Sequence, residues 1–594
     1  MCGIVGYTGN RPCQEILLAG LERLEYRGYD SAGISLISNG GVESVRAVGS
    51  PSKHLRAAMN GHPSTAVSGI GHTRWATHGR VTEENCHPHD DDSGRVHVVM
   101  NGIVENWTDL KQRLEAGGAT FTSETDTEVV AHLIASLYDG DIAEAVRMAY
   151  DELRGHYAFV AMHADQPETL VGARHQTPLV AGLADGESFI ASAIPAFLGD
   201  TRRIQLVEDG EIVVITPEGA RFLDASGAAV QREVQEVDWD VETAEKGGYE
   251  SFMLKEIHEQ ADAVAETVVD RLAHGTVELG DIGTSDGHLR DLRRVVIVAC
   301  GTSYHAGLIG RYAIESWSRV PVEMDVASEF RYRDPVIDGR DLVIGITQSG
   351  ETADTLAAMR LAREKGAKVL AITNVMGSQA TRDSDGVLFT RAGLEIGVAA
   401  TKTFVAQVAA MYLFALKLAA VHDTLEPEHF ERLVSELRGL SHKVGEVVEW
   451  ADAPVRAMAE HWQDAGFFLY LGRHAGLAVA LEGALKLKEI AYVPTDAYAA
   501  GEMKHGPIAL LDERTPVVCV ATDSPVLDKV LSNVSETRAR GAHVLALATE
   551  GNTEVAKHAE EVVYVPSSDW MLQPLLAVIP LQLLAYYIAS GKGL

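Results

Sequence analysis

Short apolar runs rich in β-branched side chains, separated by glycine-containing turns, dominate the first 237 residues of the chain. Clear examples lie at 33–37, 96–100 and 212–215. Runs of this length, bounded by turn residues, are typical of short strands. The pattern therefore predicts an α+β layered domain over 1–237, rich in strands and with a few helices.

The pattern changes twice along the rest of the chain. Residues 238–285 are charged and helical in pattern, with the apolar run 252–257 at their centre, which predicts a helical connector that packs on the domain after it. Beyond residue 286, continuous apolar runs such as 295–299 and 342–346 alternate with helical patterns. Continuous apolar runs are expected for parallel strands that are covered on both faces.

The second half also resembles an internal duplication. The sequence GAKVLAI at 366–372 matches GAHVLAL at 541–547, and further strand-like runs ending in glycine correspond at a similar spacing. This repetition predicts two α/β domains of doubly wound type, at 286–440 and 441–594. In such sheets, ligands bind beyond the carboxyl ends of the strands.

Composition narrows the class of protein. A chain of 594 residues is too long for one core, and its net charge is −33, with 84 acidic against 51 basic residues. The sequence has no basic patch, which disfavours nucleic-acid binding. So large an acidic excess repels itself unless salt screens it. We therefore expect a halophilic protein from a high-salt cytoplasm; the alternative is an ordinary acidic enzyme.

Cysteines and apolar stretches both indicate a cytoplasmic protein. The five cysteines are scattered, which predicts reduced thiols rather than a disulfide framework. The first twenty residues lack the basic start and long apolar core of a signal peptide. The apolar stretch 574–589 is interrupted by Pro580 and Gln582, and it predicts a buried helix rather than a membrane span.

The second residue is the most informative candidate for chemistry. Removal of Met1 would make Cys2 the first residue, with a thiol nucleophile and a free α-amino group together. An amine with a pKa of about 8 can take the thiol proton directly or through one water. This position indicates an N-terminal-nucleophile amidohydrolase. The alternative is an ordinary buried cysteine in the first strand.

Other segments of the first domain supply the groups that such a hydrolase needs. The Asn101 side chain and the Gly102 N–H are two donors for an oxyanion hole. Arg74 and Asp126 have the charges that hold the carboxylate and the ammonium group of a free amino acid. Asn101 and Gly102 could instead form a turn, and Asp126 could be a helix cap. A metal site at 87–89 is disfavoured, and that run is interpreted as a solvated loop.

These motifs together resemble the class II glutamine amidotransferase domain. The resemblance rests on MCGIVGY at 1–7, LEYRGYDSAG at 24–33, HTRWATHG at 72–79 and NGIVEN at 101–106, in that order and spacing. It implies an N-terminal-nucleophile glutaminase in which Cys2 attacks the side-chain amide of L-glutamine and Asn101 and Gly102 form the oxyanion hole. It further implies that the bound amino acid is held by Arg74, Thr77, His78 and Asp126, and that Trp75 gates the passage of ammonia.

Two kinds of polar group follow in the second half. Hydroxyls and backbone amides at 301–303 and 347–352 follow two strands, where helix N-termini suit a phosphate; the alternative is two ordinary helix caps. Glu482, Lys486 and Glu489 share one helix face, and a polar turn lies at 504–507. Such groups would serve sugar ring opening and proton transfer between C1 and C2. The alternative is an exposed ion-pair face.

The second half resembles paired sugar-isomerase (SIS) domains, and the whole chain is similar to the glutamine–fructose-6-phosphate aminotransferase family. The resemblance implies a cytoplasmic homodimer that uses no metal or organic cofactor. It implies that Glu489, assisted by Lys486, moves the proton between C1 and C2, and that His505 opens the ring from the other subunit. It also implies a sugar-phosphate site made of Thr302, Ser303, Thr347, Gln348, Ser349, Thr352 and Val398.

The chain departs from the family pattern at its last residues. The family continues with a tail similar to PRNLAKSVT, whose lysine forms an imine with the sugar, whereas this sequence stops at Leu594. We expect a shortened chain; the alternative is a glutaminase with impaired synthase activity or a sugar-phosphate sensor. Phosphoribosyl amidotransferases and asparagine synthetases share the first domain, but the pyrophosphate and ATP loops that they need are missing here.

Overall fold

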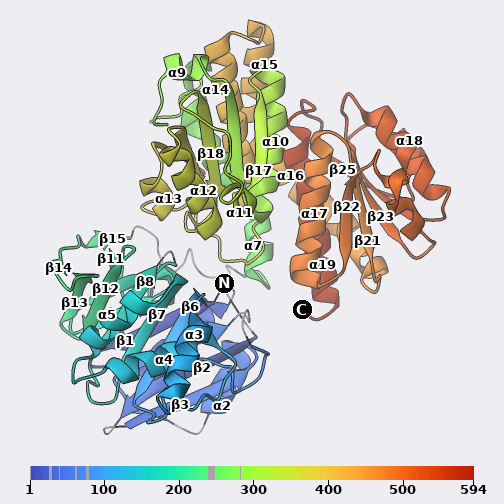
Figure 1. The fold of residues 1–594 in the computed structure, drawn as a ribbon. Coiled ribbons are helices and arrows are strands. Elements are labelled where there is room, and N and C mark those ends of the chain that lie inside the picture. Colours follow the sequence, from blue (N-terminus) through green and yellow to red (C-terminus); the bar gives the residue numbers. More distant parts are fainter. Residues whose placement is uncertain are drawn as a thin grey trace. The chain divides into compact units, whose positions relative to one another are not determined.

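The structure is a computed structural model that describes residues 2–25, 28, 30–38, 41–60, 63–74, 79–175, 177–237, 248–280 and 282–594. It divides the chain into two compact units, Met1–Glu245 and Lys246–Leu594. Figure 1 shows the strands and helices of each unit. The predicted boundary at 237 and 238 falls beside residues 238–247, which lie outside the described residues.

The first unit is built on two antiparallel sheets. One has the order β15-β11-β9-β10-β1-β4-β2-β3 and the other β14-β13-β12-β8-β7-β6-β5. The strands of the first sheet are β1 (Gly3–Thr8), β2 (Ser31–Ser38), β3 (Gly41–Val48), β4 (Ser68–Arg74), β9 (Val180–Ala184), β10 (Glu187–Ala191), β11 (Arg203–Leu206) and β15 (Gln235–Glu236). Those of the second are β5 (His89–Asp90), β6 (Val96–Val104), β7 (Gly155–His163), β8 (Leu170–His175), β12 (Glu211–Thr216), β13 (Gly219–Asp224) and β14 (Ala229–Val230).

The sheets pack face to face, and helices cover their outer faces. Ile4 and Ile70 of the first sheet share one apolar cluster with Val99 and Val160 of the second. The helical segments are α1 (Cys13–Arg23), η2 (Pro51–Leu55), α2 (Arg56–Met59), α3 (Trp107–Ala116), α4 (Asp126–Leu137), α5 (Ile142–Glu152) and η3 (Ile194–Ala196). Helix α1 packs on the first sheet, and α4 and α5 pack on the second. The predicted layered α+β domain is therefore present.

The second unit begins with helices and continues as two parallel five-stranded sheets. The strand orders are β17-β16-β18-β19-β20 and β22-β21-β23-β24-β25, so both sheets have the doubly wound order 2-1-3-4-5. The first sheet holds β16 (Arg294–Ala299), β17 (Val322–Val326), β18 (Asp341–Thr347), β19 (Lys368–Thr373) and β20 (Gly386–Phe389). The second holds β21 (Phe468–Gly472), β22 (Thr495–Ala499), β23 (Pro516–Ala521), β24 (His543–Thr549) and β25 (Glu561–Val565).

Helices cover both faces of each sheet, as the continuous apolar strands require. The helical segments from the start of the unit to the end of its first α/β half are α7 (Phe252–His258), α8 (Gln260–Val268), η4 (Val269–Gly275), α9 (Asp286–Arg290), α10 (Gly301–Trp317), α11 (Ala327–Phe330), α12 (Ala353–Glu364), α13 (Gln379–Arg382) and α14 (Lys402–His422). The others are α15 (Pro427–Arg438), α16 (Leu440–Trp462), α17 (Ala475–Ala491), η5 (Met503–His505), η6 (Pro507–Leu510), α18 (Leu527–Arg538), η7 (Val555–Lys557) and α19 (Gln573–Gly591). The predicted pair of doubly wound domains is confirmed.

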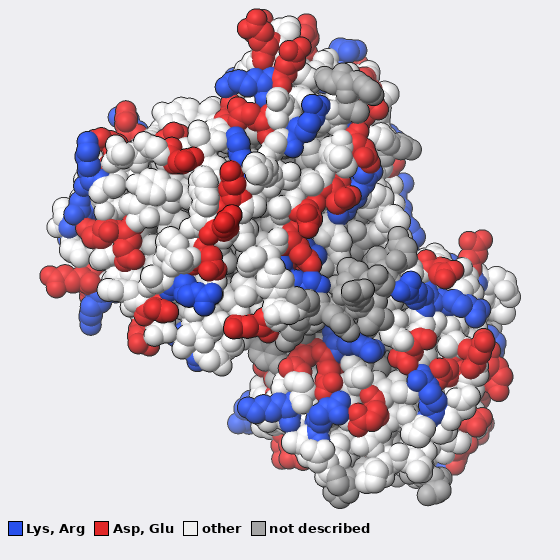
Figure 2. Space-filling view, turned by 180° about the vertical axis from the view of Figure 1, so that it is seen from behind, with Lys and Arg blue, Asp and Glu red and all other residues white. Residues whose placement is uncertain are grey.

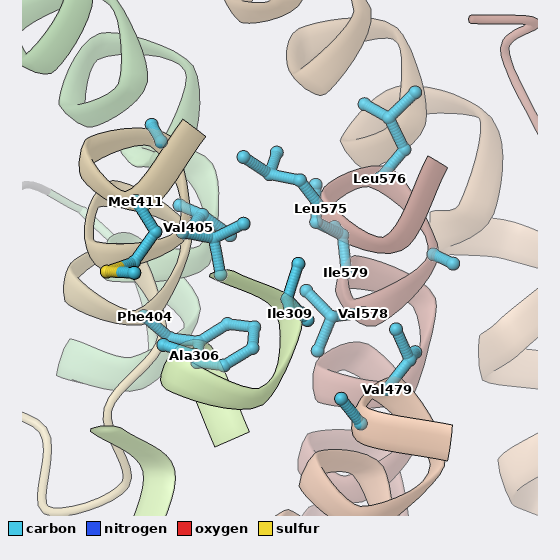
Figure 3. Packing of buried hydrophobic residues seen from close by; sticks show 14 of the residues in the cluster. Ala306, Ile309, Phe404, Val405, Met411, Val479, Leu575, Leu576, Val578 and Ile579 are labelled. Carbon is cyan, nitrogen blue, oxygen red and sulfur yellow. The ribbon is translucent and has the colours of Figure 1, made fainter. Parts of the chain in front are cut away.

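One apolar core runs through both sheets of the second unit. Ile309 of α10, Val405 of α14, Val479 of α17 and Ile579 of α19 belong to the same buried cluster (Figure 3). Met253 of α7 and Val264 of α8 join this cluster. Helix α8 packs on α14 and α16, and α7 packs on α19 and α16, so the helical segment before the first parallel sheet contacts both α/β domains rather than only the one after it. Among the described helices, α14 and α19 are long and apolar enough to span a membrane, but 89% of the most apolar window of each is buried.

Candidate active sites

Cys2 lies at the end of the central strand of the first sheet. Its side chain is partly exposed, and β1 pairs with β4 so that Gly3 faces Thr73. A side chain on Gly3 would bring a Cβ within 2.8 Å of both Leu24 and Thr73, so glycine is needed beside the cysteine. Arg74 follows Thr73 and is 3% exposed. The structure therefore places a buried guanidinium next to the strand end that carries the thiol.

The electrostatics of Arg74 connect the predicted groups of this site. Burial lowers the pKa of the Arg74 guanidinium, whereas the charges of Cys2, Asp30 and Asp126 act in the opposite direction. The guanidinium also donates hydrogen bonds to the backbone oxygens of Gly79 (3.1 Å) and Arg80 (3.2 Å). Cationic charge near a thiol favours the thiolate, which is the nucleophilic form.

Asn101 and Gly102 lie within β6 rather than in a turn. The Asn101 side chain is 5% exposed, and its Nδ2 donates a hydrogen bond to the Cys2 carbonyl oxygen at 3.1 Å. Gly102 has a φ of +95°, and a Cβ there would lie 2.1 Å from the backbone oxygen of His156. The interpretation of these two residues as a turn is wrong, and the structure brings the Asn101 side chain to the thiol-bearing strand end, with Gly102 next to it on β6.

Asp126 is the first residue of α4, and its side chain faces the same strand. It is 5% exposed, and its Oδ2 accepts a hydrogen bond from the Val104 N–H at 2.9 Å. Thr125 is the N-cap but makes no side-chain cap hydrogen bond, and Glu128 accepts from the backbone of Thr122 and Ser123 instead. Asp126 is therefore not the cap of α4, and it is anchored to β6 two residues beyond Gly102.

The sequence also made predictions for the segments 75–78 and 87–89, near this site. Trp75, Thr77 and His78 lie outside the described residues, so their predicted roles stay predictions. The interpretation of 87–89 as a solvated loop is wrong, because His87 and His89 are 6% and 1% exposed. Burial lowers the pKa of both imidazoles well below their ordinary value. Within the described residues, no group of three or more His, Cys, Asp or Glu side chains is arranged to hold a metal ion.

The predicted phosphate groups lie at the ends of two neighbouring parallel strands. β16 and β18 pair so that Ala299 faces Ile346, and α10 and α12 begin just beyond them. The strand order reverses at this pair, which is the place where doubly wound sheets bind ligands. Thr347 Oγ1 lies 2.9 Å from Thr352 Oγ1 and accepts a hydrogen bond from the Gly350 N–H at 3.2 Å.

The loop 347–352 has a shape that only glycine permits. Gly350 has a φ of +70°, and a Cβ there would lie 1.9 Å from Ser378 Oγ. Ser349 Oγ accepts from the Glu351 N–H at 3.2 Å. Hydroxyls and backbone amides thus surround the N-terminus of α12, an arrangement suited to an anion. Ser303, Gln348 and Ser349 are partly exposed and could reach a ligand.

Glu482, Lys486 and Glu489 form an ionic cluster on α17, in which Glu489 is the partly exposed member. Lys486 Nζ lies 2.6 Å from Glu489 Oε2 and 3.3 Å from Glu482 Oε1. The side chains of Glu482 and Lys486 are fully buried, so the interpretation as an exposed ion-pair face is wrong. Burial lowers the pKa of the Lys486 ammonium, but the two carboxylates outweigh this effect and hold that pKa above its ordinary value. Lys486 is therefore a permanent cation beside Glu489.

Two groups on α10 complete this cluster. Thr302 Oγ1 accepts from Lys486 Nζ at 3.0 Å and donates to Glu482 Oε1 at 3.1 Å. His305 Nδ1 lies 2.7 Å from Glu482 Oε2, and sequence reasoning missed this residue. In the sequence, the one indication that His305 could join Thr302 is its position one turn later on the same helix face. Thr302 was predicted with the phosphate groups, and the structure joins it to the ionic cluster as well.

The remaining predicted residues lie apart from the cluster in the described chain. His505 is exposed in η5, and within the described residues no hydrogen bond or ion pair links it to Glu489 or Lys486. Val398 is 58% exposed. The segment before it is fixed by Glu256 of α7, whose Oε1 accepts from the N–H groups of Ile396 (2.5 Å) and Gly397 (3.0 Å).

Two family models match parts of both units. The family described as "Glutamine amidotransferase domain" matches residues 72–199. The family described as "SIS domain" matches residues 288–417 and 464–590. A solved structure of the C-terminal domain of glucosamine-fructose-6-phosphate aminotransferase from Francisella tularensis is similar to this chain, with a TM-score of 0.56 and 38% identity. That similarity covers 59% of this chain and 98% of the solved one.

Full-length relatives extend the similarity to the whole chain. The chain is 49% identical over 595 residues to the glutamine–fructose-6-phosphate aminotransferase [isomerizing] of Symbiobacterium thermophilum. It is 50% identical over 595 residues to the protein of the same name from Thermus thermophilus. Both alignments cover 100% of this chain and 97% of the relative.

Proposed function

The chain belongs to the family of glutamine–fructose-6-phosphate aminotransferases (isomerizing), and we propose that it catalyses the reaction for which that family is named. The amide nitrogen of L-glutamine is transferred to D-fructose 6-phosphate, with ketose–aldose isomerisation. The products are D-glucosamine 6-phosphate and L-glutamate. The observation that carries this proposal is the presence of two separate sets of candidate catalytic groups, one around Cys2 and one around Glu489, in a chain whose whole length aligns with 97% of such enzymes.

The groups around Cys2 support glutamine hydrolysis. In the mature chain, the α-amino group of Cys2 takes the thiol proton, and the thiolate attacks the carbon of the side-chain amide. The Asn101 Nδ2 and the Gly102 N–H donate to the oxygen that becomes negatively charged. The tetrahedral intermediate collapses to a thioester as ammonia leaves with the transferred proton. Water then cleaves the thioester, releasing glutamate and restoring the thiol.

Substrate binding in this unit follows from two buried charges. Arg74 binds the α-carboxylate of glutamine and Asp126 binds its α-ammonium group. Their fixed positions, on β4 and on the first turn of α4, orient the side-chain amide toward Cys2. Thr77 and His78 add contacts to the amino acid, and Trp75 gates ammonia, as the family resemblance implies.

The groups around Glu489 support isomerisation of the sugar. Hydroxyls and amides of Ser303, Thr347, Gln348, Ser349 and Thr352 bind the phosphate, with Val398 beside the sugar. Ammonia condenses with the C2 carbonyl of the open ketose, and water leaves. Glu489 then moves a proton from C1 to C2, while the Lys486 ammonium, 2.6 Å away, holds that carboxylate in position.

Assembly and cell location form a further part of the proposal. The exposed position of His505 supports a homodimer in which this side chain acts in the site of the partner subunit and opens the ring. We also propose a cytoplasmic enzyme adapted to high salt, given the net charge of −33. Acidic side chains are spread over the face shown in Figure 2 and intermixed with basic ones. Substrates are glutamine and fructose 6-phosphate, with no nucleic acid, metal or organic cofactor.

The test is the production of glucosamine 6-phosphate by the purified chain from glutamine and fructose 6-phosphate. Cys2→Ala should abolish glutamate release, and Glu489→Gln should abolish amino-sugar formation while glutamate release continues. Matched controls are Cys13→Ala, a buried thiol of α1, and Lys488→Met, an exposed neighbour on α17. Glutamate release without any amino sugar from the unaltered chain would favour the glutaminase alternative and overturn the proposal.

A further inference from the structure

The side-chain amide of Asn101 is held from both sides. Its Nδ2 donates to the Cys2 carbonyl oxygen at 3.1 Å, and its Oδ1 lies 3.1 Å from Nε2 of His72. Both residues are buried, with His72 fully inaccessible to solvent. The proposed function uses Asn101 as an oxyanion donor but assigns no role to His72.

Hydrogen-bond chemistry fixes which way each group faces. A carbonyl oxygen can only accept, so the amide nitrogen of Asn101 must be the atom that faces Cys2. The amide oxygen then faces His72 and can also only accept, so Nε2 of His72 must carry a hydrogen. Burial lowers the pKa of His72 to about 3, so the ring is neutral at neutral pH and carries a single hydrogen. The contact with Asn101 therefore selects the Nε2–H tautomer.

The surroundings of His72 keep its ring in place. His72 lies in β4 between Ile4 of β1 and Gly33 of β2. Its ring stacks on that of His87, with centroids 4.1 Å apart. A Cβ on Gly33 would lie 2.3 Å from the His87 backbone oxygen, so glycine at 33 lets the segment that carries His87 approach. A ring held between a strand and a stacked imidazole cannot turn away from the amide.

We propose that His72 is the positioning residue of the oxyanion hole. Its Nε2–H holds the amide oxygen of Asn101, so the amide NH₂ group stays directed at the carbonyl that Cys2 attacks. Without this contact, a half-turn of the amide would present an oxygen instead of a donor to the developing oxyanion. The inference rests on the proposed glutaminase reaction and deepens it, because His72 would act through the Asn101 amide rather than on the substrate itself.

The test compares three variants of the full chain by glutamine hydrolysis. His72→Leu removes the donor, and we expect kcat to fall at least about tenfold, toward the roughly 100- to 1000-fold that loss of one oxyanion donor costs. The KM for glutamine should change little, because Arg74 and Asp126 are untouched. His72→Gln, whose Nε2 can donate from a similar position, should recover most of kcat. His163→Gln, a buried histidine in β7 outside the site, is the matched control.

Two further measurements separate positioning from loss of fold. Alkylation of Cys2 by iodoacetamide needs no oxyanion hole, so its rate should be the same in His72→Leu and in the unaltered chain. The aldehyde analogue of glutamine adds the thiol to its carbonyl and gives a tetrahedral hemithioacetal that needs the hole, so its affinity should fall with kcat. Both results together support positioning.

The inference and the proposed function fail in different ways. An unaltered chain that does not hydrolyse glutamine overturns the proposed function itself. If that chain is active and His72→Leu keeps its kcat, the positioning role alone is wrong. Equal losses in His72→Leu and His72→Gln, or a slower alkylation of Cys2 in His72→Leu, would show that the ring serves only packing.

Discussion

At the residue scale, the chemistry of both sites depends on single side chains whose positions are fixed by close packing and hydrogen bonds with their neighbours. The sequence predicts Cys2, Asn101 and Asp126 as a set, since each sits in a short motif whose residue types fit one reaction. In the structure, Asn101 contacts the Cys2 carbonyl and Asp126 is bonded to the strand that carries Asn101. His72 and His305 could not, because their roles depend on contacts with Asn101 and Glu482, which lie far away in the sequence. The sequence shows which donors are present, but only the folded structure shows which acceptor each donor contacts.

Gly102 gives the first prediction at this scale. Gly102→Ala should abolish glutamine hydrolysis and lower the melting temperature, because the new Cβ would lie 2.1 Å from the His156 oxygen and φ is +95°. The backbone N–H that we propose as the second oxyanion donor would then move. Glutamate release and calorimetry of the full chain test this. Gly118→Ala, which has a φ of +102° but open space around its Cβ, is the control for backbone strain alone. Similar effects of both variants would contradict the role of the close contact.

Lys486 gives the second residue-scale prediction. Lys486→Met leaves Glu482 buried without its cation, and removal of one partner of a buried ion pair costs about 3–5 kcal/mol. We expect the free energy of unfolding to fall by this order and amino-sugar formation to stop, while glutamine hydrolysis continues. Urea unfolding and the two product assays measure these effects. Lys488→Met, at an exposed position of the same helix, should change neither. A fully stable Lys486→Met chain would argue against a buried ionic cluster.

At the scale of elements, local pattern predicted the strands, and distant contacts decided their order. The apolar runs at 33–37, 96–100 and 342–346 fall within β2, β6 and β18. These strands could be predicted because the apolar positions in each run show which side chains the strand buries. The pairing of Val5 with Ala191, or the order 2-1-3-4-5 of each parallel sheet, joins segments that no local pattern relates. Duplication predicted that the two parallel sheets would be alike, but not that one core would join them.

Helix α7 provides the prediction at this scale, through Glu256. Burial is the main cause, and the nearby charge of Glu395 the second, that raises the pKa of Glu256 to about 8. The reference value for a glutamate in an unfolded chain is about 4.3. Between these values the folded protein holds a proton that the unfolded chain has released. This contribution to stability is therefore fully present below about pH 4.3 and is lost as pH rises through about 8.

Glu256→Gln should remove that part of the pH dependence. We expect the melting temperature of the unaltered chain to fall more steeply between pH 5 and 8 than that of the variant. Scanning calorimetry across this range measures the difference. Glu266→Gln, an exposed position on α8, should follow the unaltered chain. Parallel curves for Glu256→Gln and the unaltered chain would mean that this carboxyl does not titrate differently on folding.

At the scale of the whole molecule, net charge sets the conditions under which the fold is stable. A charge of −33 produces self-repulsion that is long-ranged at low ionic strength and is screened within about 3 Å at 1 M salt. We expect the melting temperature to rise between 0.1 and 2 M KCl. A parallel series in an uncharged osmolyte at equal osmolality separates screening from exclusion effects. A melting temperature that stays level or falls in KCl would contradict the proposed adaptation to high salt.

The shared core of the second unit also affects how the protein is made. Helix α19 packs against α16 and α17 and buries Leu575, Leu576 and Ile579 in the cluster of Figure 3. The ribosome synthesises α16 and α17 well before it reaches residues 573–591. Until that segment emerges, the nascent chain carries an open apolar surface at the place where α19 will pack, and such surfaces favour aggregation. Translation that stalls shortly before α19 would therefore leave a chain that depends on chaperones.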